Sequence, residues 1–295
     1  MKTPKAIFEG GLDSFEMKVI ALIFMTLDHI GYFLDGILHI PLLFSILGRM
    51  SAPMFLFILA NGFRYTHDRI KYMERMYIAS VLMNLGNILA NRFFRHPLGA
   101  SVFNDIFGTM FLVLFFLYMI ERLRKAWSDK DGRKVVSSVI FIMIPLLIGA
   151  ASLRILSSED AGGGTNTLLN AAQSAVSWIS VFLPSPITVE GSVWWVVLGV
   201  CFFYLLDHKR LLAVFYILFS AAAFAFQTLP EGLSLSNILQ YNQWFMVFAL
   251  VFFLLYNGKR GRSVKTFFYV YYPAHIYGLL ALSHLLFAVC GAGHA

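Results

Sequence analysis

The sequence predicts an all-α protein, a polytopic bundle of about nine transmembrane helices whose N-terminus is cytoplasmic. Three observations indicate this fold class. The 295 residues are 59% hydrophobic and only 13% charged, a composition typical of integral membrane proteins. The apolar residues gather in runs of roughly 20, the length that crosses a hydrocarbon core of about 30 Å. Most of the Lys and Arg residues lie between these runs.

The expected spans follow one another along the whole chain, which we interpret as a single membrane domain over residues 1–295. In order they are 17–36, 42–63, 73–91, 102–121, 135–155, 189–206, 211–229, 240–256 and 267–290. Residues 157–188 combine a Gly-rich stretch, EDAGGGTNTL, with an apolar segment that Ser, Asn and Gln interrupt. This segment could form a tenth span, but we expect an interfacial or re-entrant insertion outside the cytoplasm.

The distribution of cations decides the orientation. With nine spans and an inner N-terminus, 19 of the 23 Lys and Arg residues fall on the cytoplasmic side. A tenth crossing would move six of them outside, against the positive-inside rule. Topology therefore explains the net charge of +7, and we expect no nucleic-acid partner. Cys201 and Cys290 lie in apolar runs without metal-ligand spacing, so neither a disulfide nor a metal site is expected.

Two histidines occupy apolar runs at opposite ends of the chain. His29 follows Lys18 by eleven residues, or about 16 Å of helix, and His275 follows Lys265 by ten residues, or about 15 Å. We therefore expect the two imidazoles to lie at one depth and to meet. Ionisable groups inside a membrane are costly and often mark a functional path. The alternative is that each histidine is only a packed, hydrogen-bonded contact between helices.

Asp28 precedes His29 in the same apolar run. Neighbouring residues on a helix point about 100° apart, so Asp28 needs a partner other than His29. Arg49, in the second expected span, lies at a similar depth, about 10–12 Å below the outer surface. An Asp28–Arg49 pair would cost less to bury than either charge alone. Such a pair could shape the histidine's surroundings or could simply lock two helices together.

Two cationic segments lie at the expected inner face. In NGFRYTHDRIKYMER, a continuous helix would place Arg64, Asp68, Lys71 and Arg75 on one stripe. In NGKRGRSVK, the Asn-Gly pair predicts a turn, and Gly261 permits unusual backbone conformations. Cations on such a turn can hold a phosphate ligand, although many clusters of this kind serve topology alone.

Three stretches together resemble the TraX family, named for a pilin acetylase: KVIALIFMTLDHIGYFL, GRMSAPMFLFILANGFRYTHDRIKYMERM and QWFMVFALVFFLLYNGKRGRSVKTFFYVYYPAHI. The family is similar to a superfamily of polytopic membrane acyltransferases. That superfamily has a basic residue, ten intervening positions and a histidine in its first span, matched here by Lys18 and His29, with Lys in place of the more usual Arg.

The resemblance implies an acyltransferase of a bacterial cytoplasmic (inner) membrane that uses cytoplasmic acetyl-CoA. His29 would be the general base or acyl carrier, His275 would orient the acceptor or hold the thioester oxygen, and Asp28 with Arg49 would shape the site. The acceptor would be an amine or hydroxyl of a glycan, peptide or pilin-like molecule. The residues expected to bind coenzyme A are Lys18, Asn61, Arg64, Arg69, Asn257, Lys259, Arg260 and Arg262.

Two other classes of function remain open from the residues alone. Intramembrane Asp, His and Arg also form relays in proton-coupled transporters, although matching interrupted spans in the two halves, which point to inverted repeats, are missing from the sequence. A non-enzymatic assembly factor for a pilus or envelope machine is the other alternative, but it would need no pair of intramembrane histidines.

Overall fold

The computed structural model describes residues 10–103, 105–158, 167–263 and 265–291, and the secondary-structure elements of this part of the chain are helices. The described residues contain no named strand, and their extended pairing is limited to two isolated bridges, Leu12 with Tyr256 and Asp35 with Leu38. The predicted all-α class is therefore confirmed.

Six helices among the described residues are long and apolar enough to cross a membrane, as expected of an integral membrane protein. They are Ser14–Leu34, Leu43–Tyr65, Ile106–Ser128, Gly132–Leu156, Lys209–Glu231 and Thr266–Cys290. Each coincides with an expected span. The other three expected spans are also helical: α5 (Arg69–Phe93), α9 (Ser192–Leu205) and η2 (Asn242–Ala249), which continues into α12 (Leu250–Leu255). Of these, α9 and the η2–α12 segment are apolar but shorter.

The segment 157–188 contains one helix, α8 (Thr167–Phe182), of 16 residues. It packs against α7 (Gly132–Leu156). Most of the expected Gly-rich loop, residues 159–166, lies outside the described residues.

The chain divides into two compact units. Unit 1 comprises Met1–Asn61, Leu89–Val102 and Phe202–Ala295, and unit 2 comprises Gly62–Ile88 and Phe103–Cys201.

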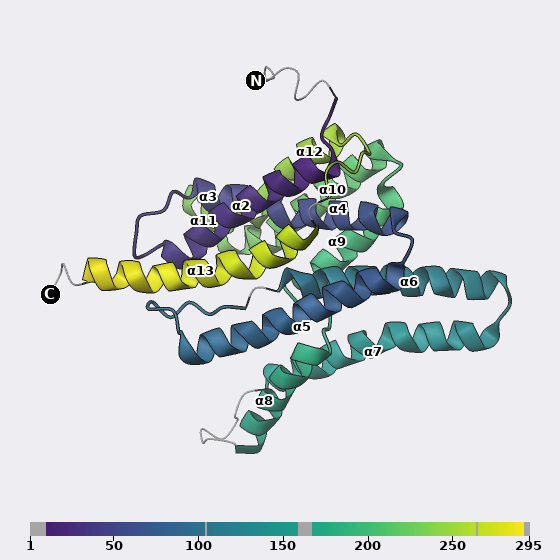
Figure 1. Cartoon of the computed structure of the whole chain (residues 1–295), viewed down its shortest axis with the longest axis horizontal. Helices are drawn as coiled ribbons and strands as arrows, with labels where there is room; N and C mark the ends of the chain where they lie inside the picture. The colour runs from purple at the N-terminus through teal and green to yellow at the C-terminus, as the bar shows by residue number, and fades with distance from the viewer. Residues whose placement is uncertain (1–9, 104, 159–166, 264, 292–295) are drawn as a thin grey trace. The chain divides into compact units, whose positions relative to one another are not determined.

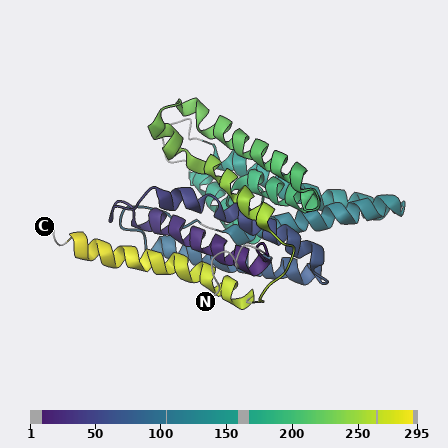
Figure 2. The same ribbon diagram turned by 90° about the horizontal axis from the view of Figure 1, so that it is seen from above.

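Within unit 1, α2 (Ser14–Leu34) packs against α3 (Leu43–Gly48) and α13 (Lys265–Gly291). In Figures 1 and 2, α2 and α13 run side by side. Lys18 contacts Phe268 and His29 contacts His275, so the two helices are parallel. α2 begins with a capping box, in which the Asp13 carboxylate accepts backbone hydrogen bonds while Glu16 accepts one from Asp13.

The rest of unit 1 is organised around η2. α3 packs on η2, and α10 (Lys209–Gln227) packs on η2 and on the short helix η1 (Leu229–Glu231). The short helix α11 (Leu235–Gln240) leads into η2.

An aromatic cluster forms the core of unit 1. Phe253 of α12 lies between Phe57 of α4 (Ser51–Tyr65), Phe202 and Tyr216, with ring centroids 4.7, 5.1 and 5.0 Å away. Tyr216 is fully buried and donates a 2.6 Å hydrogen bond to the Met246 carbonyl. Rings of this size remove much apolar area from water and fix the helices that carry them.

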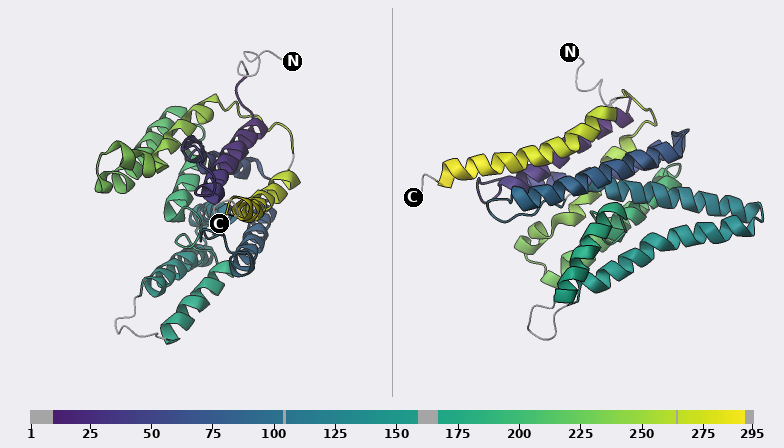
Figure 3. Two further views of the ribbon diagram at one scale, coloured as in Figure 1. Left: turned by 90° about the vertical axis from the view of Figure 1, so that its left-hand side faces the viewer. Right: turned by 60° about the horizontal axis from the view of Figure 1, so that its bottom comes forward.

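Within unit 2, α6 (Ile106–Ser128) and α7 form an antiparallel hairpin (Figure 3). α6 begins at Asp105, a buried N-cap whose carboxylate accepts hydrogen bonds from Ser80, Asn84 and the Gly108 backbone. Such a cap satisfies an amide at the helix start that has no intrahelical partner.

The expected cationic stripe through residues 64–75 is wrong. α4 ends at Tyr65 and α5 begins at Arg69, so Arg64 lies on a different helix from Lys71 and Arg75. The Asp68 carboxylate accepts a 3.0 Å hydrogen bond from the Lys71 amide. This contact provides the local reason, because a side-chain cap of that kind starts a new helix.

Candidate functional site

The two intramembrane histidines meet inside unit 1. Nε2 of His275 lies 3.1 Å from Nδ1 of His29, and the ring centroids are 4.9 Å apart. His29 is 5% exposed. The expected meeting of the first and last spans at these two residues is therefore confirmed.

His275 is held by its own helix and by α2. Its Nδ1 donates to the Tyr271 carbonyl oxygen, 3.0 Å away and one helical turn back. The Tyr271 ring stacks on the imidazole with centroids 5.2 Å apart and planes at 16°. The Tyr271 hydroxyl also lies 2.8 Å from Oγ1 of Thr26 in α2. Neither Thr26 nor Tyr271 was predicted from the sequence.

Asp28 and Arg49 form the predicted ion pair, with Nη2 of Arg49 2.5 Å from Oδ1 of Asp28. The side chains are 25% and 29% exposed, respectively. His29, the neighbour of Asp28, contacts α13 instead. Adjacent residues of α2 therefore contact different segments: the Asp28 carboxylate contacts Arg49 after α3, and the His29 imidazole contacts α13.

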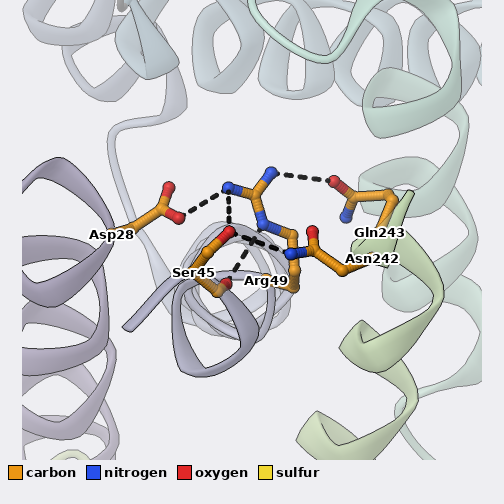
Figure 4. Close-up of polar contacts among 5 residues, drawn as sticks. All are labelled: Asp28, Ser45, Arg49, Asn242 and Gln243. Carbon is orange, nitrogen blue, oxygen red and sulfur yellow. Dashed lines mark hydrogen bonds and ion pairs between the residues drawn. The ribbon is translucent and has the colours of Figure 1, made fainter. Parts of the chain in front are cut away.

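Several polar groups hold Arg49 in place (Figure 4). Its Nε donates to the Ser45 carbonyl oxygen, 3.2 Å away, and its Nη1 donates to Oε1 of Gln243, 3.4 Å away. The Asn242 amide donates a 3.0 Å hydrogen bond to Oγ of Ser45. Asn242 and Gln243 lie at the start of the expected span 240–256, and their polar side chains at that position are the signal that could have identified them.

Arg49 lies at a break in the expected second span, between α3 and α4. The preceding residue, Gly48, is buried, and a Cβ atom at this position would overlap the Asp28 side chain. Glycine therefore permits the close approach of α3 to α2 that brings Arg49 to Asp28.

A basic loop follows α12 in unit 1, and we define it as residues 257–262. Lys259, Arg260 and Arg262 are exposed, while Gly258 and Gly261 have φ values of +78° and +65°. The Asn257 side chain stabilises the loop by accepting a 2.9 Å hydrogen bond from the Lys259 amide.

The basic loop is attached to the segment before α2. The Leu12 amide donates to the Leu255 carbonyl, the Asn257 amide to the Leu12 carbonyl, and the Ser14 amide to the Lys259 carbonyl, over 2.8–2.9 Å. The start of α2 and the basic loop are thus joined by a short parallel pairing that the sequence did not predict.

The remaining predicted residues of unit 1 lie near the start of α2. The Lys18 ammonium lies 5.7 Å from the Phe268 ring centroid, a cation–π arrangement across α2 and α13. Asn61 donates to the Tyr256 hydroxyl, which also lies 2.9 Å from Oγ of Ser14. Asn61 therefore connects the end of α4 to the segment that carries the basic loop.

Arg64 and Arg69 belong to unit 2. Arg64 is exposed, whereas Arg69 forms an ion pair with Glu121 of α6 and stacks over the Phe63 ring at 4.5 Å. These contacts give Arg69 a structural role inside unit 2.

Comparison with protein-family models gives a match over most of the chain. The family model described as TraX protein matches residues 14–283. The searches of curated proteins and of solved structures found no match. The matched range includes both histidines, the Asp28–Arg49 pair and the basic loop, and it covers nearly the whole chain. This protein therefore belongs to the TraX family.

Proposed function

We propose that this protein is a membrane acetyltransferase that moves the acetyl group of cytoplasmic acetyl-CoA to an amine or hydroxyl of a membrane-associated or extracytoplasmic acceptor. The observation that carries the proposal is the His29–His275 contact, in which the buried His29 imidazole meets the half-buried His275 imidazole inside unit 1. The resemblance of the chain to membrane acyltransferases in its Lys18–His29 spacing supports the same reading.

The proposed topology is a single membrane domain with nine spans, an inner N-terminus and an outer C-terminus, in a bacterial cytoplasmic membrane. It counts the six long apolar helices together with α5, α9 and the η2–α12 segment. The parallel course of α2 and α13 fits this arrangement, because the first and ninth spans must run in the same direction. In this topology α8 lies in an outer insertion.

The chemistry needs a base, and His29 is the candidate. An acceptor amine or hydroxyl attacks the thioester carbonyl, its N–C or O–C bond forms, and the C–S bond breaks. The acceptor's proton passes to His29 and then to the departing thiolate, which leaves as the thiol of coenzyme A. A positioned base of this kind accelerates such a reaction by about 10²–10⁴-fold. An acetyl-histidine intermediate is the variant route, with His29 as nucleophile.

The basic loop has the donor groups that a coenzyme with several phosphates requires. Lys259, Arg260 and Arg262 are exposed, and successive amides near two glycines of positive φ are typical of anion-binding turns. In the proposed reaction these residues, with Lys18, Asn61 and Asn257 of unit 1, bind the charged end of the donor. Asp28 and Arg49 shape the surroundings of His29.

Arg260→Ala tests the role of the basic loop. We expect coenzyme A to bind at least about tenfold more weakly, because one charge-assisted contact contributes about 1.5–3 kcal/mol. Lys130→Ala, which removes an exposed cation of unit 2, is the control. Equal affinities of the two variants for coenzyme A would mean that the loop does not bind the coenzyme and that its cations serve only the membrane topology.

A proton-coupled transporter is the rival proposal, because the same Asp28, His29, Arg49 and His275 side chains could relay protons. Proteoliposomes separate the two functions. An acetyltransferase releases thiol from radiolabelled acetyl-CoA, and label appears on an acceptor or on the protein. A transporter moves protons down an imposed pH gradient when acetyl-CoA is absent. Proton flux without thioester cleavage would reject the acetyltransferase proposal.

A further inference from the structure

The hydrogen bonds around the two imidazoles have a defined direction. Nδ1 of His275 lies 3.0 Å from the Tyr271 carbonyl oxygen. A carbonyl oxygen only accepts, so the proton of this bond belongs to Nδ1 of His275. In the neutral imidazole the other nitrogen, Nε2, then carries a lone pair and acts as an acceptor.

This direction determines the tautomer of His29. Nε2 of His275 lies 3.1 Å from Nδ1 of His29, and with Nε2 as acceptor, Nδ1 of His29 must be the donor. A neutral His29 therefore has its lone pair on Nε2. The Met25 carbonyl, one turn earlier in α2, is a second acceptor for the His29 ring, and the variants below separate its effect from that of His275.

His275, which accepts the hydrogen bond from His29, is held against α2 through Tyr271. Oγ1 of Thr26 donates to the Leu22 carbonyl at 2.8 Å, so its single proton is used and it accepts from the Tyr271 hydroxyl, also at 2.8 Å. The same tyrosine stacks on His275 and accepts its Nδ1–H at the carbonyl. Tyr271 thus fixes both the position and the orientation of the His275 ring.

We propose that His275 is a positioning residue that sets the tautomer of His29, keeping the proton on Nδ1 and the reactive lone pair on Nε2. Its effect on rate rests on the proposed acetyltransferase function. When Nε2 of His29 takes the acceptor's proton, the Nδ1 proton of His29 can move to Nε2 of His275. The positive charge then spreads over two rings, and the protons return as the departing thiolate is protonated.

Two amide variants of His275 test the proposal. His275→Gln keeps an oxygen able to reach Nδ1 of His29, whereas His275→Asn is one methylene shorter and loses it. The full-length protein in lipid, with ¹⁵N-labelled histidine imidazoles, is studied by NMR, and the His29 signals are assigned from their loss in His29→Gln. His275→Phe, which keeps a ring but no acceptor, repeats the Asn comparison if the Asn variant does not fold.

The expected result is a protonated Nδ1 and an unprotonated Nε2 on His29 in the wild type and in His275→Gln, and a mixture of tautomers in His275→Asn. Thioester cleavage should fall by about 10²-fold in the Asn variant and by only a few-fold in the Gln variant. If the Asn and Phe variants keep the wild-type tautomer, the Met25 carbonyl sets it and the proposal is wrong.

Two further outcomes separate the positioning role of His275 from the proposed function. Equal loss of cleavage in the Gln and Asn variants, with the wild-type tautomer kept in Gln, would mean that His275 contacts substrate directly, which would overturn its positioning role. The expected tautomers in a wild-type protein that cleaves no acetyl-CoA would reject the proposed function and leave the tautomer assignment standing.

Discussion

Removing one partner of the Asp28–Arg49 pair should destabilise unit 1 strongly. Arg49→Met deletes the guanidinium and leaves the Asp28 carboxylate in an apolar part of the bundle, 2.5 Å from where its counter-charge was. Breaking a fully buried pair in this way costs about 3–5 kcal/mol. Because the two side chains are 25% and 29% exposed, we expect the smaller value of about 2–3 kcal/mol for Arg49→Met.

Removing the carboxylate instead of the guanidinium should lower the free energy of unfolding by less. Asp28→Leu leaves Arg49 with its contacts to Ser45 and Gln243, so we expect a loss of about 1–2 kcal/mol, since a buried charge that keeps some partners is less costly. The double variant carries no unpaired charge, and its loss should be smaller than the sum of the two single losses by about 2 kcal/mol. This difference is the coupling energy of the pair.

The assay is reversible denaturant unfolding of the purified protein in mixed micelles, for the wild type, both single variants and the double variant. Independent sites add to within about 0.3–0.5 kcal/mol. A coupling energy inside that range would refute the ion pair as a stabilising contact between α2 and the α3–α4 break.

Two other substitutions test the packing around the site. Gly48→Ala places a methyl group where the Asp28 side chain lies, so the free energy of unfolding should fall by about 1–3 kcal/mol; Gly278→Ala, with nothing within 4 Å, is the control, and equal effects would contradict the close approach. Tyr256→Phe removes the hydroxyl shared by Ser14 and Asn61 and should lower the denaturation midpoint by an amount worth about 1–3 kcal/mol, whereas an unchanged midpoint would mean that this junction contributes nothing.

The sequence was most informative where charge and spacing were unusual. Helical rise alone placed His29 and His275 at one depth, because both are counted from a cation at the start of their spans. Asp28 and Arg49 could be predicted as partners because they lie at a similar depth. Each charge would be too costly to bury alone, and the sequence places no other opposite charge at that depth.

Other parts of the site depend on how the helices are rotated and interrupted, which periodicity does not determine. Thr26 and Tyr271 look like ordinary residues of an apolar helix until α2 and α13 are placed face to face. The break at Arg49 depends on the close approach at Gly48. The pairing of residues 12–14 with 255–259 joins segments more than 240 residues apart, and no local pattern indicates it.

Single-turnover cleavage of radiolabelled acetyl-CoA tests most directly whether His29 performs the proposed chemistry. Purified wild type, His29→Ala and His208→Ala are mixed with acetyl-CoA under conditions in which each binds it. His208 is an exposed histidine before α10 and serves as the control. We predict that wild type and His208→Ala cleave the thioester, whereas His29→Ala binds acetyl-CoA normally and cleaves it at least about 10²-fold more slowly. Cleavage by His29→Ala at the wild-type rate would contradict the account.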